Sequence, residues 1–496
     1  MAVTVLDVAQ LIGARMQGGT AEQAQVPITE VGLNSAELPA GALFAAVPGT
    51  RVHGRFAADT AAAAILTDEA GWGLLSAAGE TRPVLVVDDV RSVLGVAAAA
   101  VYGDPSSQLT VIGITGTSGK TTTSYMLEAG LLAAGYRVGL IGTTGTQING
   151  RPVPTSLTTP EAPTLQALFV QMLAEGVTHV VMEVSSHALM LGRVLGVKFD
   201  VAGFTNLSQD HLDFHATMAE YFDAKALFFR PGSPTRAAQA VVCVDDEWGE
   251  KMASVFGSGV RTLATRGQAG DYTVSAVQTV ERGGQEFRLA APSGAVVAAT
   301  VPLPGRFNVA NAALALALAD TVGVDMTALL PGLAGVGVPG RMEVVDCGQD
   351  FLAVVDYAHK PAAIKAVLAT VRGQITGRIG LVVGAGGDRD HSKRPIMGAE
   401  AAAGADYVVV TDDNPRNEDP AAIRAQVLAG TAAGSAEVVE IGDRRAAIRQ
   451  VVAWAKPGDA VIIAGKGHEV GQLIDGVTHH FDDREELRAA LEGRDQ

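Results

Sequence analysis

A glycine-rich turn in the first third of the chain carries residues that can bind a polyphosphate. Residues 113–123 have the sequence GITGTSGKTTT and follow an apolar run typical of a strand. Backbone N–H groups in such a turn can surround an anion, and a helix after it adds the positive end of its dipole. Lys120 can reach the outer phosphates, and the Thr121 hydroxyl can bind Mg²⁺. The strict Walker pattern is not met, because Ile114 stands at its first glycine position. A turn that binds nothing is the alternative, but we predict a nucleoside triphosphate between Gly116 and Thr121.

Two polar clusters follow other apolar runs of the same region. Glu183 lies in MEVSSHAL, and His211 lies in TNLSQDHLDFH. The carboxyl ends of strands in an open α/β sheet line the ligand crevice, so both clusters can face the glycine turn. Glu183 and His211 could then hold a second cation beside the one at Thr121. For each residue alone, helix capping by Asp210 and Asp213 and packing of the histidines is the plainer alternative.

Lys225 lies among apolar residues in EYFDAKALFF. A lysine in such a helix usually extends its ammonium group to water. A partly buried lysine can instead lose its proton and become reactive.

The elements that must position these residues form three blocks. Residues 1–108 contain the expected strands GALFAAVPG and PVLVVDD and an expected helix RFAADTAAAA, and YGDPSSQ has the composition of a boundary. Residues 109–338 alternate apolar strands with helices, which predicts a mostly parallel sheet, then a β-rich stretch and a long buried helix, GRFNVANAALALALADTVG. Residues 339–496 return to β/α alternation after the glycine-rich GLAGVGVPGR. We predict three α/β domains in a row.

Composition limits the partners and the location. Of 496 residues, 48% are hydrophobic and 18% charged, and the net charge of −16 disfavours nucleic acid and anionic membranes as partners. Cys243 and Cys347 lie in apolar, strand-like contexts, so we expect two buried free thiols and a reducing compartment. Neither a signal peptide nor an apolar run of about 20 residues is present, which predicts a cytoplasmic protein without membrane insertion.

A series of motifs resembles the Mur ligase family. They occur in order over about residues 113–470: GTSGKTTT, LTTPEAPT, MEVSSHAL, NLSQDHLDFH, FDAKALFF, PGRFNVANA, VPGRME, VDYAHKP, GAGGDRD, DDNPR and GKGHE. The resemblance implies an N-terminal UDP-substrate-binding domain, a central P-loop ATPase domain and a C-terminal Rossmann-like domain that delivers an amino acid.

The resemblance also implies a reaction. The members that this chain is most similar to add meso-2,6-diaminopimelate to UDP-N-acetylmuramoyl-L-alanyl-D-glutamate in peptidoglycan precursor synthesis. The substrate carboxylate attacks the γ-phosphate of ATP, and the amine then displaces phosphate from the acyl phosphate. Two Mg²⁺ ions and Lys120 offset the repulsion between the anions. A monomer that binds small-molecule substrates is expected.

The matching motifs imply roles for individual residues. Lys120, Glu183, His211 and Lys225 are the catalytic residues that the resemblance implies; Lys225 is carbamylated, and Thr121, Glu183 and His211 hold magnesium. The ATP-binding positions are Gly116, Thr117, Ser118, Gly119, Lys120, Thr121, Thr122, Asn308, Asn311, Arg341 and Asp356. The UDP-muramoyl-dipeptide positions are Leu33, Ser35, Thr50, Arg51, Val52, Thr158, Thr159, Ser185 and Arg193. At the expected uridine end, the segment LNSAEL departs from the Asp-Ser-Arg common in the family.

The choice of amino acid can be argued from DDNPR and its neighbours. Meso-diaminopimelate ends in an ammonium and a carboxylate, and arginines can bind the carboxylate in a bidentate manner. Lysine lacks that second carboxylate. A solvated turn is the alternative for the bare tetrad. Diaminopimelate is therefore predicted to contact Arg389, Asp413, Asn414, Pro415, Arg416, Gly465 and Glu469.

Three alternatives stay open at this point. The first is a sister ligase that adds lysine or another diamino acid. The second is a ligase similar to folylpolyglutamate synthetase, against which DNPR and the extended N-terminal block argue. The third is a nucleotide-binding scaffold without activity, which the intact set of catalytic residue types disfavours.

Overall fold

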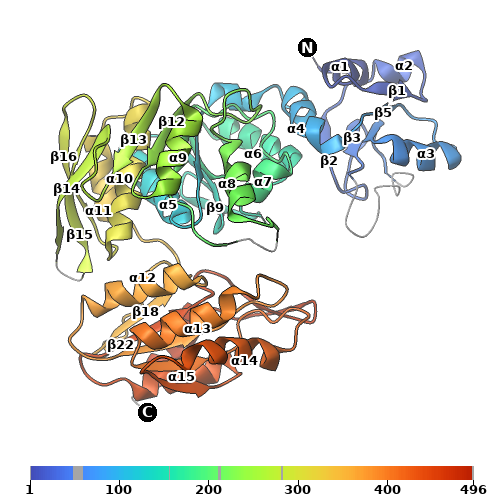
Figure 1. The fold of residues 1–496 in the computed structure, drawn as a ribbon. Coiled ribbons are helices and arrows are strands. Elements are labelled where there is room, and N and C mark those ends of the chain that lie inside the picture. The colour runs from blue at the N-terminus through green and yellow to red at the C-terminus, as the bar shows by residue number, and fades with distance from the viewer. Residues whose placement is uncertain (1, 48–59, 156, 211–213, 281–282, 494–496) are drawn as a thin grey trace.

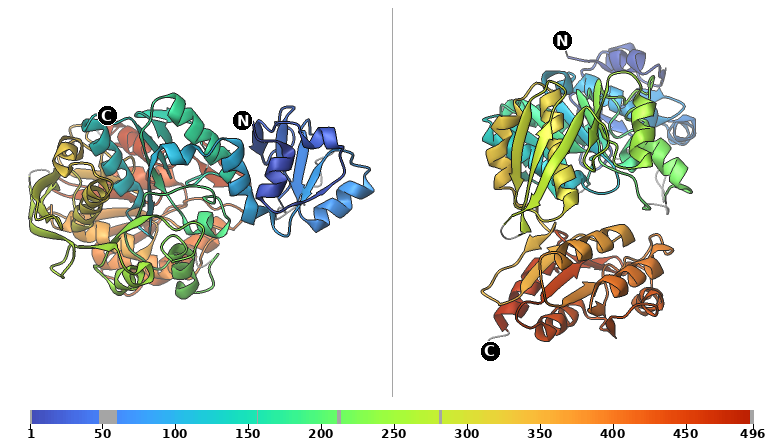
Figure 2. Two further views of the ribbon diagram at one scale, coloured as in Figure 1. Left: turned by 90° about the horizontal axis from the view of Figure 1, so that it is seen from above. Right: turned by 60° about the vertical axis from the view of Figure 1, so that its left-hand side comes forward.

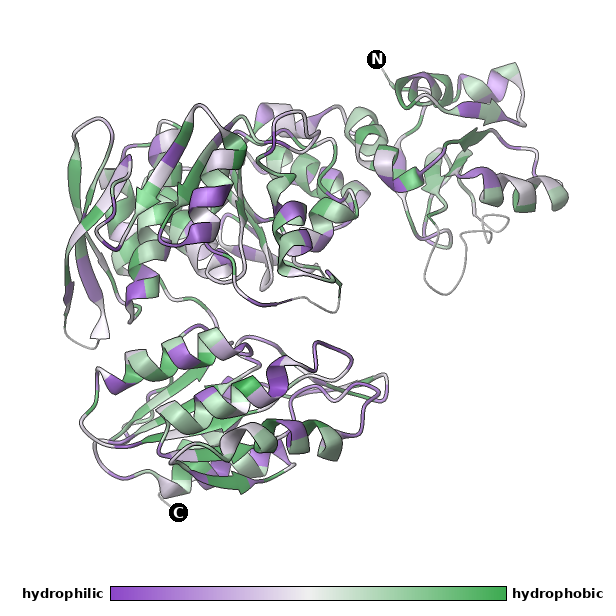
Figure 3. Ribbon diagram, in the orientation of Figure 1, coloured by the Kyte–Doolittle hydropathy of each residue, from purple (hydrophilic) through white to green (hydrophobic). Residues whose placement is uncertain are grey.

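Three β-sheets divide the computed structural model, which describes residues 2–47, 60–155, 157–210, 214–280 and 283–493. We call the parts built on them the N-terminal, central and C-terminal units. Figure 1 shows the N-terminal unit at one end of the central unit and the C-terminal unit below it, and Figure 2 shows the same arrangement from two other sides. The strands of the sheets are mainly hydrophobic (Figure 3), as expected for sheets covered on both faces.

The N-terminal unit has a five-stranded sheet. Its spatial order is β1 (Arg15–Gln17), β5 (Val84–Val86), β4 (Ala64–Thr67), β3 (Ala42–Ala45) and β2 (Glu30–Gly32), with only β1 antiparallel to its neighbour. One face packs on α1 (Val5–Leu11) and α4 (Val90–Val101), and the other on α3 (Glu69–Ala77). Short helix α2 (Ala21–Ala24) lies near the N-terminus.

Both strands expected in this block are confirmed, but the helix expected at RFAADTAAAA is wrong in its described part. Residues 60–63 are not helical, and β4 begins at Ala64. The helix propensity of alanine is only a small preference. Packing in the middle of a sheet overrides it here.

The central unit has an eleven-stranded sheet whose middle is parallel, as predicted. Its order is β16 (Val296–Val301), β15 (Gln285–Ala290), β14 (Tyr272–Thr279), β13 (Val260–Ala264), β12 (Gln239–Cys243), β11 (Val201–Phe204), β6 (Thr110–Thr115), β10 (His179–Glu183), β7 (Val138–Gly142), β8 (Gly145–Ile148) and β9 (Arg151–Val153). Antiparallel strands extend it at both edges, β15–β16 at one and β8–β9 at the other. The β-rich stretch expected around residues 260–302 is thus part of this sheet.

Two hydrophobic cores cover the central sheet. One face packs on α5 (Lys120–Ala133), α10 (Arg306–Thr321) and α11 (Met326–Ala334). The other packs on α6 (Ala162–Ala174), α7 (Ser186–Met190), α8 (Met218–Ala226) and α9 (Glu247–Phe256). The predicted long buried helix is α10, whose Leu and Ala side chains are buried on all sides, as expected for a helix inside a core.

The C-terminal unit is doubly wound, which confirms the Rossmann-like prediction. Its order is β17 (Glu343–Val344), β18 (Leu352–Asp356), β22 (Ala460–Ala464), β19 (Ile379–Val383), β20 (Tyr407–Val410) and β21 (Glu437–Glu440), with only β17 antiparallel. Helices α12 (Pro361–Arg372), α13 (Lys393–Gly404) and α14 (Pro420–Thr431) cover one face; α15 (Arg444–Trp454) and α16 (Asp483–Glu492) cover the other. Hairpin strands β23 (Gln472–Ile474) and β24 (Val477–His479) lie outside the sheet.

Other expectations have mixed outcomes. Cys243 is buried as predicted, but Cys347 is exposed, because it follows the end of the short edge strand β17. Among the described helices, none combines the length and the apolar composition that a membrane-spanning helix requires. The boundaries at residues 108 and 338 stay a prediction.

Glu128 is a buried acid on α5, and it makes stability depend on pH. Burial raises the pKa of its carboxyl from 4.5 to about 7. The charged form is therefore disfavoured in the folded state, and the free energy of unfolding falls as pH rises from about 4.5 to about 7.

We expect Glu128→Gln to have a melting temperature several degrees above wild type at pH 8, since the removed penalty is roughly 3 kcal/mol. The difference should disappear near pH 5, where the wild-type carboxyl is protonated. Thermal unfolding followed by circular dichroism at both pH values measures this effect. The exposed Glu247→Gln is the control, and an equal shift at pH 5 and pH 8 would contradict the assignment.

Candidate functional site

In the glycine turn between β6 and α5, two glycines have backbone conformations that other residues rarely adopt. Gly116 has φ +142° and Gly119 has φ +89°. A Cβ on Gly116 would lie 1.9 Å from Thr205 Oγ1, and one on Gly119 would lie 2.3 Å from Asn311 Oδ1. The turn therefore leads into the N-terminus of α5 with neighbouring segments in close contact, as a phosphate-binding loop requires.

Three ammonium groups converge on two successive carbonyls of this turn. The Gly116 carbonyl accepts hydrogen bonds from Lys120 Nζ (2.8 Å) and Lys225 Nζ (3.0 Å). The Thr117 carbonyl accepts from Lys120 Nζ (3.1 Å) and from Lys360 Nζ (3.2 Å). Lys120 belongs to α5, Lys225 to α8, and Lys360 to the C-terminal unit just before α12. Such a concentration of positive charge at a helix N-terminus favours a polyanionic ligand.

Burial and mutual repulsion change the ionisation of these lysines. Burial, then the charge of Lys360, lowers the pKa of Lys120 to about 8. Burial, then the charge of Lys120, lowers the pKa of Lys225 well below its ordinary value. One carboxylate compensates directly, because Asp210 Oδ2 lies 2.7 Å from Lys360 Nζ. Lys225 Nζ also lies 4.5 Å from the centroid of the Tyr221 ring.

Glu183 ends β10 beside the turn and is almost completely buried. Its two carboxylate oxygens accept from the Thr143 backbone N–H (2.9 Å) and the Thr143 hydroxyl (3.0 Å). Each oxygen accepts only one of these bonds and keeps a lone pair for a further ligand. The Thr121 hydroxyl, 3.3 Å from Arg341 Nη2, is a second oxygen donor in the same cleft.

This donor set suits magnesium bound mainly by phosphate oxygens and water, since Mg²⁺ prefers hard oxygen ligands. Among the described residues, no group of three or more His, Cys, Asp or Glu side chains could hold a metal alone. His211, the remaining predicted ligand, lies outside the described residues.

A cleft of about 1300 Å³ brings most of the predicted residues together. It lies where the C-terminal unit faces the central unit with α12 (Figure 1). Its lining includes Thr117, Ser118, Gly119, Lys120, Thr121, Thr122, Thr158, Thr159, Glu183, Ser185, Arg193, Asn308, Asn311, Arg341, Asp356 and Arg389. Gly116 and Lys225 contact each other just beneath the turn.

Some predicted residues are not brought to this cleft. Leu33 and Ser35 lie after β2 in the N-terminal unit and do not line it. Thr50, Arg51 and Val52 lie outside the described residues.

The predicted ATP-binding residues of α10 and of the C-terminal unit form two separate hydrogen-bonded groups at the cleft. Asn311 Nδ2 donates to Asn308 Oδ1 (3.1 Å), and the Thr123 hydroxyl donates to Asn311 Oδ1 (3.4 Å), which joins α10 to α5. Asp356 accepts from the backbone N–H groups of Met342 and Ala358, each at 2.8 Å. These contacts fix the start of the C-terminal unit beside the cleft.

On the other side of Glu183, a polar wall runs toward the N-terminal unit. The Thr159 hydroxyl donates to the Glu183 carbonyl at 2.9 Å, and Ser185 caps α7. Arg193 Nε lies 2.9 Å from Glu161 Oε1, and Glu161 Oε2 also lies 3.3 Å from Arg91 Nη1 of α4. The predicted dipeptide positions of the central unit thus lie between the glycine turn and the N-terminal unit.

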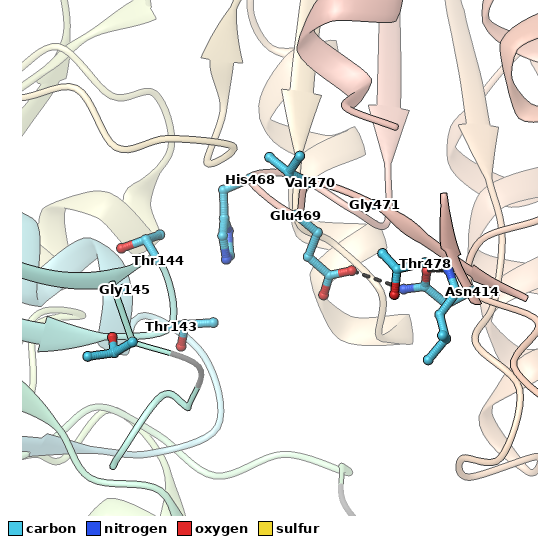
Figure 4. Close-up of a pocket in the computed structure, with 11 residues that line it drawn as sticks. Thr143, Thr144, Gly145, Asn414, His468, Glu469, Val470, Gly471 and Thr478 are labelled. Atoms are coloured by element: carbon cyan, nitrogen blue, oxygen red, sulfur yellow. Dashed lines mark hydrogen bonds between the residues drawn. The ribbon is translucent and has the colours of Figure 1, made fainter. Parts of the chain in front are cut away.

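A second cavity of about 400 Å³ lies between the central and C-terminal units. In Figure 4, Thr143, Thr144 and Gly145 lie on one side, and Asn414 and Glu469 meet on the other through a hydrogen bond of 3.0 Å. Asp413 and Gly465 lie close to these residues, since a Cβ on Gly465 would be 2.9 Å from Asp413 Oδ2.

The two predicted arginines occupy neighbouring loops and do not line this second cavity. Arg416 Nη1 donates to the Gly387 carbonyl at 2.6 Å, with Pro415 packed against Gly387. Burial, then repulsion by Arg389, lowers the pKa of Arg416. The predicted set is therefore distributed over the loops after β19, β20 and β22, which follow adjacent parallel strands.

Sequence reasoning missed several residues of the site. Lys360 and Lys466 stand inside the quoted motifs VDYAHKP and GKGHE, but nothing in the motifs indicated their partners. Thr143 lies outside all of the quoted motifs. Asp210, for which helix capping was the plainer alternative, pairs with Lys360.

Comparison with known proteins agrees with this geometry. The model of the Mur ligase middle domain matches residues 114–319, and that of the Mur ligase, glutamate ligase domain matches residues 340–467. A Corynebacterium glutamicum protein named UDP-N-acetylmuramoyl-L-alanyl-D-glutamate–2,6-diaminopimelate ligase is 61% identical over 98% of this chain and 97% of its own.

Two solved structures are also similar. One, of a UDP-N-acetylmuramoyl-L-alanyl-D-glutamate–2,6-diaminopimelate ligase, is 32% identical, covers 100% of both chains and has a TM-score of 0.68. A Mycobacterium tuberculosis folylpolyglutamate synthase, solved in complex with ADP and AMPPCP, covers 76% of this chain and 92% of its own at 22% identity and a TM-score of 0.62. The second likeness shows a shared fold alone.

The Lys360–Asp210 ion pair links the C-terminal unit to the central unit, so its loss should favour separation of the two. Removing one member of a buried pair costs about 3–5 kcal/mol, a cost that hydration of Asp210 in an open form relieves. We expect Lys360→Met to have a larger radius of gyration than wild type in small-angle X-ray scattering. Lys365→Met, which changes an exposed lysine of α12, is the control. A scattering profile identical to wild type would contradict this role.

Proposed function

This chain belongs to the Mur ligase family, and we propose that it joins meso-2,6-diaminopimelate to UDP-N-acetylmuramoyl-L-alanyl-D-glutamate at the expense of ATP. The observation that carries the proposal is one continuous cleft, which places the glycine turn and the ammonium groups of Lys120 and Lys360 beside Glu183 and the wall of Thr158, Thr159 and Arg193. The 61% identity to the Corynebacterium glutamicum ligase over almost the whole chain supports the same substrates. The product is a peptidoglycan precursor.

In the first step, the terminal glutamyl carboxylate attacks the γ-phosphorus of ATP. A bond forms between the carboxylate oxygen and phosphorus, the bond to the β-phosphate oxygen breaks, and ADP leaves. The nucleophile and the triphosphate are both anionic, so the step depends on positive charge already in place. Lys120 supplies that charge from the turn, and Arg341 supplies it from the C-terminal unit. Mg²⁺, held at two sites by Thr121, Glu183 and His211 together with phosphate oxygens, would add further neutralisation.

In the second step, the neutral amine of the amino acid attacks the acyl carbon. A C–N bond forms, the C–O bond to phosphate breaks, and phosphate leaves together with the proton lost by the amine. The amine must come from the C-terminal unit, whose cavity at Asn414 and Glu469 opens opposite Thr143. Thr143 also holds Glu183, so this cavity adjoins the first site.

We propose that Lys225 is carbamylated. Its lowered pKa increases the fraction of neutral amine, which is the form that adds to CO₂ with loss of a proton. The resulting carbamate is anionic and would meet the ammonium groups of Lys120 and Lys360, which repel the unmodified Lys225. The modification therefore turns an unfavourable buried charge into a compensated one.

The amino acid is proposed to be a diamino dicarboxylate rather than lysine. Arg389 and Arg416 offer two guanidinium groups on adjacent loops, and a second carboxylate of the substrate can pair with them. An activity similar to that of folylpolyglutamate synthase is disfavoured, since that likeness covers 76% of this chain. The proposed partners are these small molecules, ATP and Mg²⁺, and the protein is proposed to act as a monomer in the cytoplasm.

An amino-acid panel tests the function directly. We expect ADP release, measured by a coupled assay with UDP-N-acetylmuramoyl-L-alanyl-D-glutamate, to depend on meso-diaminopimelate. L-lysine should be used about 100-fold less well or worse, because the guanidinium groups would be left without a carboxylate. Equal turnover with lysine would refute the assigned amino acid, and no amino-acid-dependent turnover at all would refute the ligase assignment.

Chemical rescue tests the modification. We expect Lys225→Ala to lose most activity and to regain part of it with short carboxylates such as acetate, because they replace the carbamate charge. Lys120→Ala is the matched control, since a carboxylate cannot replace an ammonium group. Full activity of Lys225→Ala without added carboxylate would exclude a role for the carbamate.

A further inference from the structure

Lys466 is a buried cation that the two reaction steps leave without a role. It follows β22 in the C-terminal unit, and its side chain is 0% exposed. Burying a lysine so completely is costly unless partners compensate its charge, so its partners indicate what it does.

The ammonium group of Lys466 has three partners on the loops that form the second cavity. It donates to Asn414 Oδ1 at 2.9 Å, and it lies 3.4 Å from Asp413 Oδ1 and 3.8 Å from Glu469 Oε2. The Leu473 backbone N–H also donates to Asn414 Oδ1, at 3.0 Å. Because two donors occupy that oxygen, the amide nitrogen of Asn414 must point the other way.

The orientation of Asn414 in turn sets the position of Glu469. Asn414 Nδ2 donates to Glu469 Oε2 at 3.0 Å, as the dashed line in Figure 4 shows. On the other side, the Tyr357 hydroxyl donates to Glu469 Oε1 at 3.0 Å. Each carboxylate oxygen thus has one donor from the protein and can still accept from a ligand in the cavity.

The charges of the cluster also depend on Lys466. Asp413 and Glu469 lie on loops at the carboxyl end of the sheet. Burial, then the charge of Asp413, raises the pKa of Glu469, and the charge of Lys466 opposes that rise. With Lys466 present, the cluster of Asp413, Glu469 and Lys466 has one net negative charge when both acids are ionised. That charge can attract one ammonium group.

The reaction decides which ammonium group that is. The amine that attacks the acyl phosphate must be neutral, whereas a carboxylate partner would keep it protonated. Glu469 therefore suits the other, unreacting ammonium of a diamino acid.

We propose that Lys466 is a positioning residue that, through Asn414, holds the Glu469 carboxylate in place to bind the unreacting ammonium group of the amino-acid substrate. The inference rests on the proposed function. It adds a residue that the site needs in order to recognise the second ammonium group of the substrate. Lys466 itself does not line the cavity and acts through its neighbours.

Substrate analogues separate this role from a merely structural one. The test compares meso-diaminopimelate with 2-aminopimelate, which lacks the second ammonium, in wild type, Lys466→Met and the exposed control Lys456→Met. We expect Lys466→Met to raise the KM for meso-diaminopimelate about 10- to 100-fold, as loss of a hydrogen-bonded charge does. The KM for ATP and the kcat/KM for 2-aminopimelate should change little, so the preference for meso-diaminopimelate should decrease.

A second variant guards against general damage to the fold. Asn414→Ala removes the hydrogen-bonded link, so Lys466→Met should raise the KM for meso-diaminopimelate less in an Asn414→Ala background than in wild type. An unchanged preference between the two analogues in Lys466→Met, or additive effects in the double variant, would overturn the inference. If Lys466→Met does not fold, the same two comparisons with Lys466→Gln decide. Failure of wild type to use meso-diaminopimelate would instead overturn the proposed function.

Discussion

The convergence of Lys120, Lys225 and Lys360 on the carbonyls of Gly116 and Thr117 is the interaction on which the rest of the site depends. Three ammonium groups so close together repel one another, and burial together with the charge of Lys360 lowers the pKa of Lys120. Such an arrangement is stable only because the rest of the fold holds it in place, and it becomes favourable when anions arrive. In the proposed reaction, a triphosphate, a substrate carboxylate and a carbamate on Lys225 would each supply the missing negative charge.

The origin of the cations explains why the site needs more than one unit. Lys120 and Lys225 belong to the central unit, whereas Lys360 and Arg341 come from the C-terminal unit and contact Thr117 and Thr121. The positive field is therefore complete only when the two units are together. The same contacts bring the cavity at Asn414 and Glu469 opposite Thr143. Under the proposed function, docking of the C-terminal unit would therefore complete the phosphate site and deliver the amine in one event.

What could be predicted from the sequence was mostly local. The glycine turn follows from backbone requirements of neighbouring residues, and the parallel sheets follow from apolar runs alternating with helices. The helix expected at RFAADTAAAA, in its described part, and the burial expected for Cys347 were wrong, since both depend on which strands lie beside them.

Contacts between distant segments could not be predicted in the same way. Asp210 and Lys360 are far apart in the chain, and only the docking of two units brings them to 2.7 Å. The role inferred for Asn414, in the loop after β20, likewise depends on Lys466, which belongs to the loop after β22. The roles assigned from the family motifs to residues such as Arg416 and Leu33 stay predictions, because a motif names a position but not what contacts it.

Under the proposed function, the C-terminal unit must treat the two amino groups of one substrate, which are on carbons of opposite configuration, differently. One amine has to lose its proton before it attacks, and the other must remain charged to be recognised. A carboxylate close to both amino groups would keep the nucleophile protonated. Without a carboxylate close to the other amino group, the site would not select a diamino acid. The structure separates these requirements in space: Glu469 is held by Asn414 and Tyr357 on the C-terminal side of the cavity, whereas Glu183 is occupied by Thr143 on the central side. Under the proposed function, the remaining lone pairs of Glu183 would be engaged by Mg²⁺, which would keep this carboxylate from pairing with the attacking amine. Selectivity and reactivity are therefore compatible because the two carboxylates are fixed by different units.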